Sequence, residues 1–196
     1  MRADLRVVAD MVAPESRVLD LGCGDGELLL HLAKVRGCRG VGVDADPDSV
    51  VAAISRGVSV VELDIDTELG EFADNSFDTV VLSQTLQATR RPDWIVREMM
   101  RIAPTGVVSV PNFGWWQHRI NLGLGGRMPV SKALPNPWYS TPNIHLATLH
   151  DMTTLFADEN IAVRRRVLLR PDGSPASVFG PPNLLAAGAA YLISRP

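Results

Sequence analysis

The sequence predicts an α/β protein in which a doubly wound, parallel sheet carries helices on both faces. Short apolar, β-branched runs alternate with helical patterns along the chain, which is the order of elements in such a sheet. A glycine-rich turn follows the first run, and acidic residues stand at the ends of the first three runs. With 196 residues and 46% hydrophobic content the chain is long enough for one core, and we expect residues 1–196 to form one domain.

The predicted strands are runs of apolar and β-branched residues without polar alternation. That pattern is typical of parallel strands buried on both faces. The five runs are Val18–Leu21, Gly40–Val43, Val58–Leu63, Phe77–Ser83 and Val107–Val110. Two later stretches, IAVRRRVLL from Ile161 and AAYLIS from Ala189, are also predicted to be strands.

The helices between these strands have readable ends. The helix after the second strand is predicted to have Asp46 as its N-cap, Pro47 at its first position and Gly57 at its C-terminal end. Another helix is predicted from Pro92 to about Ala103, because its apolar residues fall on one face.

A later helix is predicted from Asp151 to Glu159, and its start carries a capping-box pattern formed by Thr148 and Asp151. His145 precedes this pattern. We expect His145 to fix the chain as it enters the helix, in preference to acting as a catalytic base.

The long segment 111–147 is the unusual part of the sequence. We expect a short helix through Ile120 and Leu122, stopped by Gly125 and Gly126, and then a loop punctuated by prolines. Loops of this length are usually lids, binding surfaces or disordered, and the aromatic content argues against disorder. The aromatic residues are Trp115, Trp116, Trp138 and Tyr139. Three alternatives stay open: a pocket lid, a partner interface, or a satellite core over the sheet.

Charge and composition exclude several classes of partner. The formal net charge is only −3, so the chain has no basic field to attract nucleic acid or an anionic membrane. Asp4 and Asp10 interrupt what would be the apolar core of a signal peptide, and no apolar run has membrane-spanning length. Cys23 and Cys38 form no framework, which fits a reducing cytoplasm. The four histidines lack ligand spacing, so we expect no metal site.

The glycine turn lies in the stretch RVLDLGCGDGELL, residues 17–29. In a doubly wound sheet, ligands bind beyond the carboxyl ends of the strands, where backbone N–H groups at a helix N-terminus approach them. A P-loop is excluded because no Gly-Lys-Ser/Thr follows. A dinucleotide site is disfavoured because Gly22, Gly24 and Gly26 have the spacing G-x-G-x-G, with Glu27 at the position of the third glycine.

Three carboxylates favour S-adenosylmethionine, or its product S-adenosylhomocysteine, as the ligand. Asp20 would repel a pyrophosphate, but it attracts a ligand that carries an ammonium and a sulfonium. Asp44, at the end of the second strand, is predicted to accept both ribose hydroxyls. Asp64, at the end of the third strand, is predicted to accept from the adenine amino group, with Ile65 against the ring.

Two sets of residues summarise these predictions. The predicted cofactor-binding residues are Asp20, Gly22, Cys23, Gly24, Asp44, Ala45, Asp64, Ile65 and Ser83, with Cys23 contributing its backbone. The candidate acceptor or partner surface consists of Gln84, Gln87, Trp115, His118, Tyr139 and His145. For Gln84 and Gln87 the alternative is a simple backbone cap, and no strong base stands near the predicted methyl position.

The motifs RVLDLGCGDGELL, GVGVDADP and SFDTVVLSQTL resemble successive signature regions of class I S-adenosylmethionine-dependent methyltransferases. The later motifs LSQTLQATRRPD, VSVPNFGWW, GRMPV and TPNIHLATLHD are similar to those of the MetW family of bacterial methionine biosynthesis. This resemblance runs from about Leu5 to Val163. Departures from the family pattern are Trp115, Asn136 and Ser140.

The resemblance implies a seven-stranded, mostly parallel sheet with an antiparallel last strand. It also implies a function in methionine synthesis together with the homoserine O-acyltransferase MetX, as an accessory or regulatory subunit. The alternative is an active small-molecule methyltransferase, whose acceptor enters between the loop Ser83–Arg91 and the aromatic segment.

Overall fold

A single seven-stranded sheet organises the chain in the computed structural model, which describes residues Met1–Pro196. The strands are β1 (Arg17–Leu21), β2 (Arg39–Asp44), β3 (Val60–Glu62), β4 (Thr79–Ser83), β5 (Thr105–Pro111), β6 (Ala162–Leu169) and β7 (Gly188–Ser194). Their spatial order is β3-β2-β1-β4-β5-β7-β6, and β7 runs antiparallel to both of its neighbours. The predicted seven-stranded, mostly parallel sheet is therefore confirmed.

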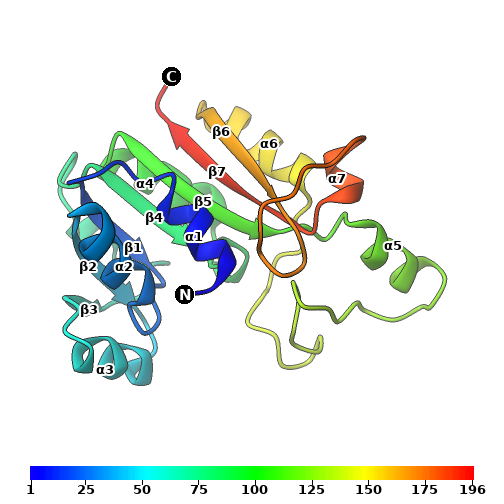
Figure 1. Cartoon of the computed structure of the whole chain (residues 1–196), viewed down its shortest axis with the longest axis horizontal. Coiled ribbons are helices and arrows are strands. Elements are labelled where there is room, and N and C mark those ends of the chain that lie inside the picture. Colours follow the sequence, from blue (N-terminus) through cyan, green and yellow to red (C-terminus); the bar gives the residue numbers. More distant parts are fainter.

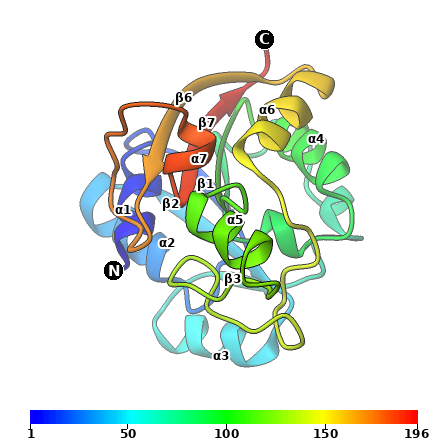
Figure 2. The same cartoon turned by 90° about the vertical axis from the view of Figure 1, so that its right-hand side faces the viewer.

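Helices cover both faces of this sheet (Figures 1 and 2). They are α1 (Ala3–Ala9), α2 (Glu27–Arg36), α3 (Pro47–Ser55), α4 (Pro92–Ile102), α5 (Trp116–Gly123), α6 (Leu149–Asp158) and α7 (Pro182–Leu185), with short 3-10 turns η1 (Leu69–Glu71) and η2 (Leu86–Ala88). Helices α1, α2 and α3 pack on one face, while α4 and α6 pack on the other. Helix α5 stands apart from both layers, beyond the end of β5.

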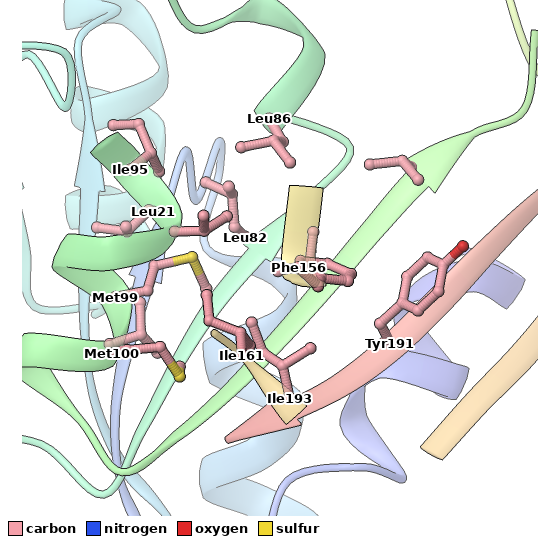
Figure 3. Packing of buried hydrophobic residues seen from close by; sticks show 14 of the residues in the cluster. Leu21, Leu82, Leu86, Ile95, Met99, Met100, Phe156, Ile161, Tyr191 and Ile193 are labelled. Atoms are coloured by element: carbon pink, nitrogen blue, oxygen red, sulfur yellow. The ribbon is translucent and has the colours of Figure 1, made fainter. Parts of the chain in front are cut away.

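The alternation of strand side chains divides the interior into two cores. In β1, Val18 packs with the α1 and α2 side, whereas Leu19 packs with the α4 and α6 side. The second core is the larger one, and Figure 3 shows Leu82 beside Met99 of α4 there, with Phe156 of α6 near Tyr191 of β7. Because both faces bury apolar side chains, the strands need the continuous apolar runs seen in the sequence.

The predicted helix ends are confirmed where a cap was readable. Asp46 caps α3 by accepting from the Ser49 amide at 3.1 Å, and Pro47 is the first residue of that helix. Gly57 follows it with φ of +80°, the left-handed conformation that often ends a helix. The capping box at the start of α6 is complete, with Thr148 and Asp151 each accepting from the other's amide.

Strand β3 is shorter than predicted. The amide of Val58 donates to the Ala53 carbonyl, so this residue still belongs to the turn that ends α3. Three residues of β3 pair with β2, and β3 is an edge strand with no other neighbour. Asp64 therefore lies two residues beyond the end of β3, in the loop that leads to η1. Helices α1 and α7 were not predicted, because helices of seven and four residues depend on tertiary packing for their stability.

None of the helices is both long enough and apolar enough to cross a membrane.

Candidate cofactor-binding site

A cavity of about 280 Å³ opens beyond the carboxyl ends of β1 and β4. Five of the predicted cofactor residues line it: Asp20, Gly22, Cys23, Gly24 and Ser83. The other four, Asp44, Ala45, Asp64 and Ile65, follow β2 and β3 and do not line this cavity. The topology thus gathers the first group in one cavity and leaves the second group along the neighbouring strand ends.

The glycine loop is folded onto β2. The amides of Gly22 and Cys23 both donate to the Val43 carbonyl, at 2.8 and 3.0 Å. The Gly24 amide donates to Asp44 Oδ2 at 2.8 Å, and Asp44 Oδ1 accepts from the Asp46 amide at 3.0 Å. These three amides donate within the protein, so they are not free donors of the kind that a phosphate cradle presents. The expected approach of a ligand to N–H groups at the helix N-terminus stays a prediction.

Gly22 is required by both conformation and space. Its φ is +71°, and a Cβ added there would lie 2.6 Å from Thr85 Oγ1. A side chain would therefore be strained by the backbone and would collide with the start of the β4 loop. This close approach brings the β1 and β4 loops together and forms one wall of the cavity.

Asp20 is the buried acid of the site. Its side chain is only 2% exposed at the end of β1. Burial, and to a smaller extent the nearby charge of Asp44, raises the pKa of Asp20 to about 7. No hydrogen-bond donor acts to lower this pKa. The carboxyl group is thus poised between its neutral and charged forms near neutral pH.

The other acids of the cavity already have cationic partners. Glu27 accepts from the amino terminus of Met1 at 2.9 Å, and Asp25 pairs with the guanidinium of Arg56. Asp20 is the carboxylate that no side chain of the protein neutralises. A buried charge is stable only when it is paired, so the cavity has the chemistry to accept a cationic ligand group.

Asp64 and Ile65 lie in the loop after β3. Asp64 Oδ1 accepts from the Asp66 amide at 2.9 Å, so the half-buried carboxylate is held in place. Ile65 packs against the larger core from its edge. Asp66 is used elsewhere, because its Oδ1 accepts from the amide of Arg90 at 2.8 Å. The functions predicted for Asp64 and Ile65 stay predictions.

A larger cavity of about 600 Å³ neighbours the first, and both are lined by Arg2 and Gln84. Gln87 also lines the larger cavity. The Gln87 side chain donates from Nε2 to the Gln84 carbonyl at 2.6 Å, which is the capping alternative, and its buried Oε1 has no partner.

The candidate acceptor or partner residues divide into buried and exposed groups. Trp115 and His118 are buried, and the two rings stack edge to face at 5.1 Å. His118 interacts through Nδ1 with the Asn112 carbonyl and through Nε2 with Ser131, so both ring nitrogens are occupied. Burial lowers the pKa of His118. Tyr139 and His145 are exposed on the loop after α5.

These placements show which residues of the segment 111–147 form a satellite core and which do not. Trp115 and His118 form a small satellite core, as one alternative held. Trp116 is partly exposed and lies at the edge of this core, with its ring centroid 6.1 Å from that of Trp115. Trp138 and Tyr139 are exposed and take no part in it, so for these two residues a lid or a partner interface remains.

The structure adds residues that no sequence pattern indicated. Arg2 and Leu5 line the cofactor cavity because α1 packs across the sheet near it. These contacts join the start of the chain to strand ends far along the sequence, so only the tertiary fold brings them together and no local spacing could have revealed them. Thr85 directly follows the predicted fourth strand, where residues near the ligand are expected, and it meets Gly22 across the loops.

The fold is shared with solved methyltransferases. An S-adenosylmethionine-dependent methyltransferase from Mesorhizobium loti superposes with a TM-score of 0.71 at 15% identity, over 98% of each chain. A methyltransferase in complex with a methyltransferase activator from Haloferax volcanii gives 0.71 at 17% identity, over 99% of this chain and 89% of that one. The protein therefore has the class I methyltransferase fold. Within that class the chain belongs to the MetW family, because the family model described as methionine biosynthesis protein MetW matches residues 2–193.

One relative is a longer, bifunctional protein. The bifunctional methionine biosynthesis protein MetXA/MetW of Rhodopirellula baltica is 29% identical over 205 residues. The match covers all of this chain but only 33% of the relative. The chain thus spans about a third of that relative's length.

Proposed function

We propose that this chain binds S-adenosylmethionine and acts in methionine biosynthesis as an accessory or regulatory subunit of a homoserine O-acyltransferase. The observation that supports this ligand is the burial of Asp20, whose carboxyl group has no cationic partner in the protein. A ligand that carries an ammonium and a sulfonium supplies the missing positive charge.

Other residues have matching functions in this proposal. Asp44 accepts the ribose hydroxyls: each of its oxygens accepts one backbone hydrogen bond and keeps a further lone pair. Asp64 and Ile65 hold the adenine, while Ser83 and Gln84 line the wall near the methionine part. When bound, S-adenosylmethionine supplies an electrophilic methyl group.

Two observations support the accessory function. The MetXA/MetW relative carries both parts in one polypeptide, and MetX is the homoserine acyltransferase that the family resemblance implies. The larger cavity is lined by no histidine, cysteine or tyrosine, and of its two acids Asp4 is paired with Arg2 while Asp172 accepts from Ser174. This cavity therefore offers no histidine, cysteine or tyrosine to act as a base for a protonated acceptor.

A second function, methyl transfer to a small molecule, is favoured by one observation. The larger cavity lies next to the proposed cofactor cavity and has about 600 Å³ for an acceptor. Methyl transfer is a direct displacement, so an acceptor that is already deprotonated needs alignment and no base.

Calorimetric titration tests the ligand. We expect S-adenosylmethionine and S-adenosylhomocysteine to bind the native chain with micromolar affinity, and Asp20→Asn to weaken S-adenosylmethionine by at least about tenfold, since it removes a charge-assisted contact. The control is Asp158→Asn, an exposed acid at the end of α6. Failure of the native chain to bind either ligand contradicts the proposal.

Acyltransferase assays test the pathway function. We expect the rate of the homoserine O-acyltransferase from the same organism to change when the purified chain is added. An unchanged rate, with no complex in gel filtration, rules out the accessory function. Formation of S-adenosylhomocysteine from S-adenosylmethionine with a pathway metabolite would instead establish the methyltransferase.

A further inference from the structure

Helix α5 and the loop that follows it expose an unusual amount of apolar surface. Helix α5 buries a single side chain, that of His118. Trp116, Ile120 and Leu124 are exposed at a spacing of four residues, so they form one stripe along the helix. The loop continues this surface with Trp138, which is 71% exposed, and Tyr139, which is 74% exposed. Figure 2 shows α5 and this loop in front of the sheet, with the loop continuing from α5 to α6.

All charged side chains of the same segment are positive. Residues 111–147 contain no aspartate or glutamate, although the whole chain has a net charge of −3. The segment carries Arg119, Arg127 and Lys132, and all three are exposed. Aromatic and arginine side chains are those that anchor protein interfaces. A complementary partner therefore presents both apolar and acidic groups to this segment.

We propose that residues 116–146 are the docking surface for the homoserine O-acyltransferase, which meets it with apolar and acidic groups. This inference rests on the proposed accessory function and adds the site of contact. A standard interface takes about 20 to 30 residues from each partner, and the segment is of that size. In the Rhodopirellula baltica relative the MetXA part is joined to the MetW part, which keeps such a partner close.

A second copy of this chain fits the surface poorly. A two-fold symmetric contact places the same surface patch of each copy against that of the other. Here that arrangement would bring Arg127 and Lys132 of both copies together without an opposing acid, and like charges across an interface are destabilising. Because the segment carries only positive charges, we infer that its partner is a different protein.

Paired variants test the surface. We expect Ile120→Ser with Leu124→Ser, and separately Trp138→Ser with Tyr139→Ser, to weaken binding to the acyltransferase by at least about 30-fold in calorimetry, as loss of interface anchors does. The matched control is Val51→Ser with Ile54→Ser on α3, whose side chains are 62% and 58% exposed. This control should bind as the native chain does.

A charge variant tests the expected acidic groups of the partner. Arg127→Glu should slow association severalfold, whereas Lys34→Glu on α2 should not, because complementary charge acts on the association rate. All variants are first checked for native circular dichroism and S-adenosylmethionine affinity, so that misfolding is separated from loss of contact.

The outcomes distinguish this inference from the proposed function. If the native chain binds the acyltransferase and both surface pairs bind equally well, the docking surface is wrong while the accessory function stands. If the native chain does not bind it, both fail. Doubling of the chain's own mass in light scattering, lost in the surface variants, assigns the surface to a second copy. Binding to anionic vesicles with the same loss assigns it to a membrane, and either result overturns the inference.

Discussion

At the scale of single residues, the protonation of Asp20 controls the charge of the candidate site. Its pKa of about 7 means that the neutral and charged forms of the ligand-free protein are both populated near pH 7. A cationic ligand favours the carboxylate, so binding lowers this pKa and releases the proton. The affinity then depends on the fraction of the protein that is already ionised.

We therefore expect the affinity for S-adenosylmethionine to rise about tenfold between pH 6 and pH 8, because the ionised fraction of a group with a pKa of about 7 rises by that factor. Calorimetry at a series of pH values measures this rise, and Asp20→Asn should abolish it. A flat profile for the native chain would show that Asp20 does not face the cationic part of the ligand.

The same residue affects stability with the opposite dependence on pH. The folded-state pKa of Asp20 is raised above its ordinary value of 3.8. The folded state therefore holds the proton more tightly, and this stabilisation is complete below about pH 4 and is lost as pH rises through 7. Urea denaturation of the ligand-free chain should show that Asp20→Asn removes this part of the pH dependence, relative to Asp158→Asn.

Gly22 gives a second prediction at this scale. Gly22→Ala should lower the free energy of unfolding by about 2–4 kcal/mol, because it combines a left-handed backbone with a collision. Gly57→Ala is the matched control: its φ is +80°, but an added Cβ meets nothing within 4 Å. The control should lose only about 1 kcal/mol. Equal losses in urea denaturation would mean that Thr85 moves aside freely.

At the scale of elements, the sequence predicted the features that depend on interactions between residues close together in the chain. The caps of α3 and α6 depend on hydrogen bonds between residues three apart, and both were predicted correctly. The buried strands were predicted correctly because continuous apolar, β-branched runs are typical of parallel strands buried on both faces. Strand β3 was predicted too long, since the turn after α3 takes Val58. Helix α1 was missed because its stability comes from packing on α2 and the sheet.

The candidate site shows the same division. The strand-end acids and the glycine loop could be read from spacing, because each acts through its own strand. The burial of His118 and the folding of the Gly24 amide onto Asp44 could not, since both depend on segments brought together by the fold. For Gln87 the sequence left a backbone cap as one of two alternatives, and the structure supplies the partner, the Gln84 carbonyl.

The capping box of α6 yields a prediction at this scale. Thr148→Ala should lower the free energy of unfolding by about 1 kcal/mol, because it leaves the Asp151 amide without its acceptor. Thr153→Ala in the same helix is the control. Thr153 bonds back to the Leu149 carbonyl, and alanine has the higher helix propensity, so stability should stay level or rise slightly. Urea denaturation that ranks the two variants the other way would contradict this account of the helix start.

At the scale of the whole molecule, the proposed docking surface and the proposed cofactor site share an anchor. The amides of Ile144 and His145 both donate to the Gln87 carbonyl at 3.0 Å. The Gln87 side chain holds the Gln84 carbonyl, and Gln84 lines the cofactor cavity. A ligand that changes the position of Gln84 thus acts on the loop that would contact the partner.

This connection predicts coupled binding. S-adenosylmethionine should change the affinity for the acyltransferase by a factor within the usual allosteric range of about 5 to 150, and the acyltransferase must change the affinity for S-adenosylmethionine by the same factor. Four calorimetric titrations, each ligand with and without the other, measure both factors. Gln87→Ala should bring them towards one, because it frees Gln84, while Val51→Ser with Ile54→Ser should leave them unchanged. A factor of one in the native chain would mean that the cofactor does not regulate assembly, since an effector with equal affinity for two states shifts neither.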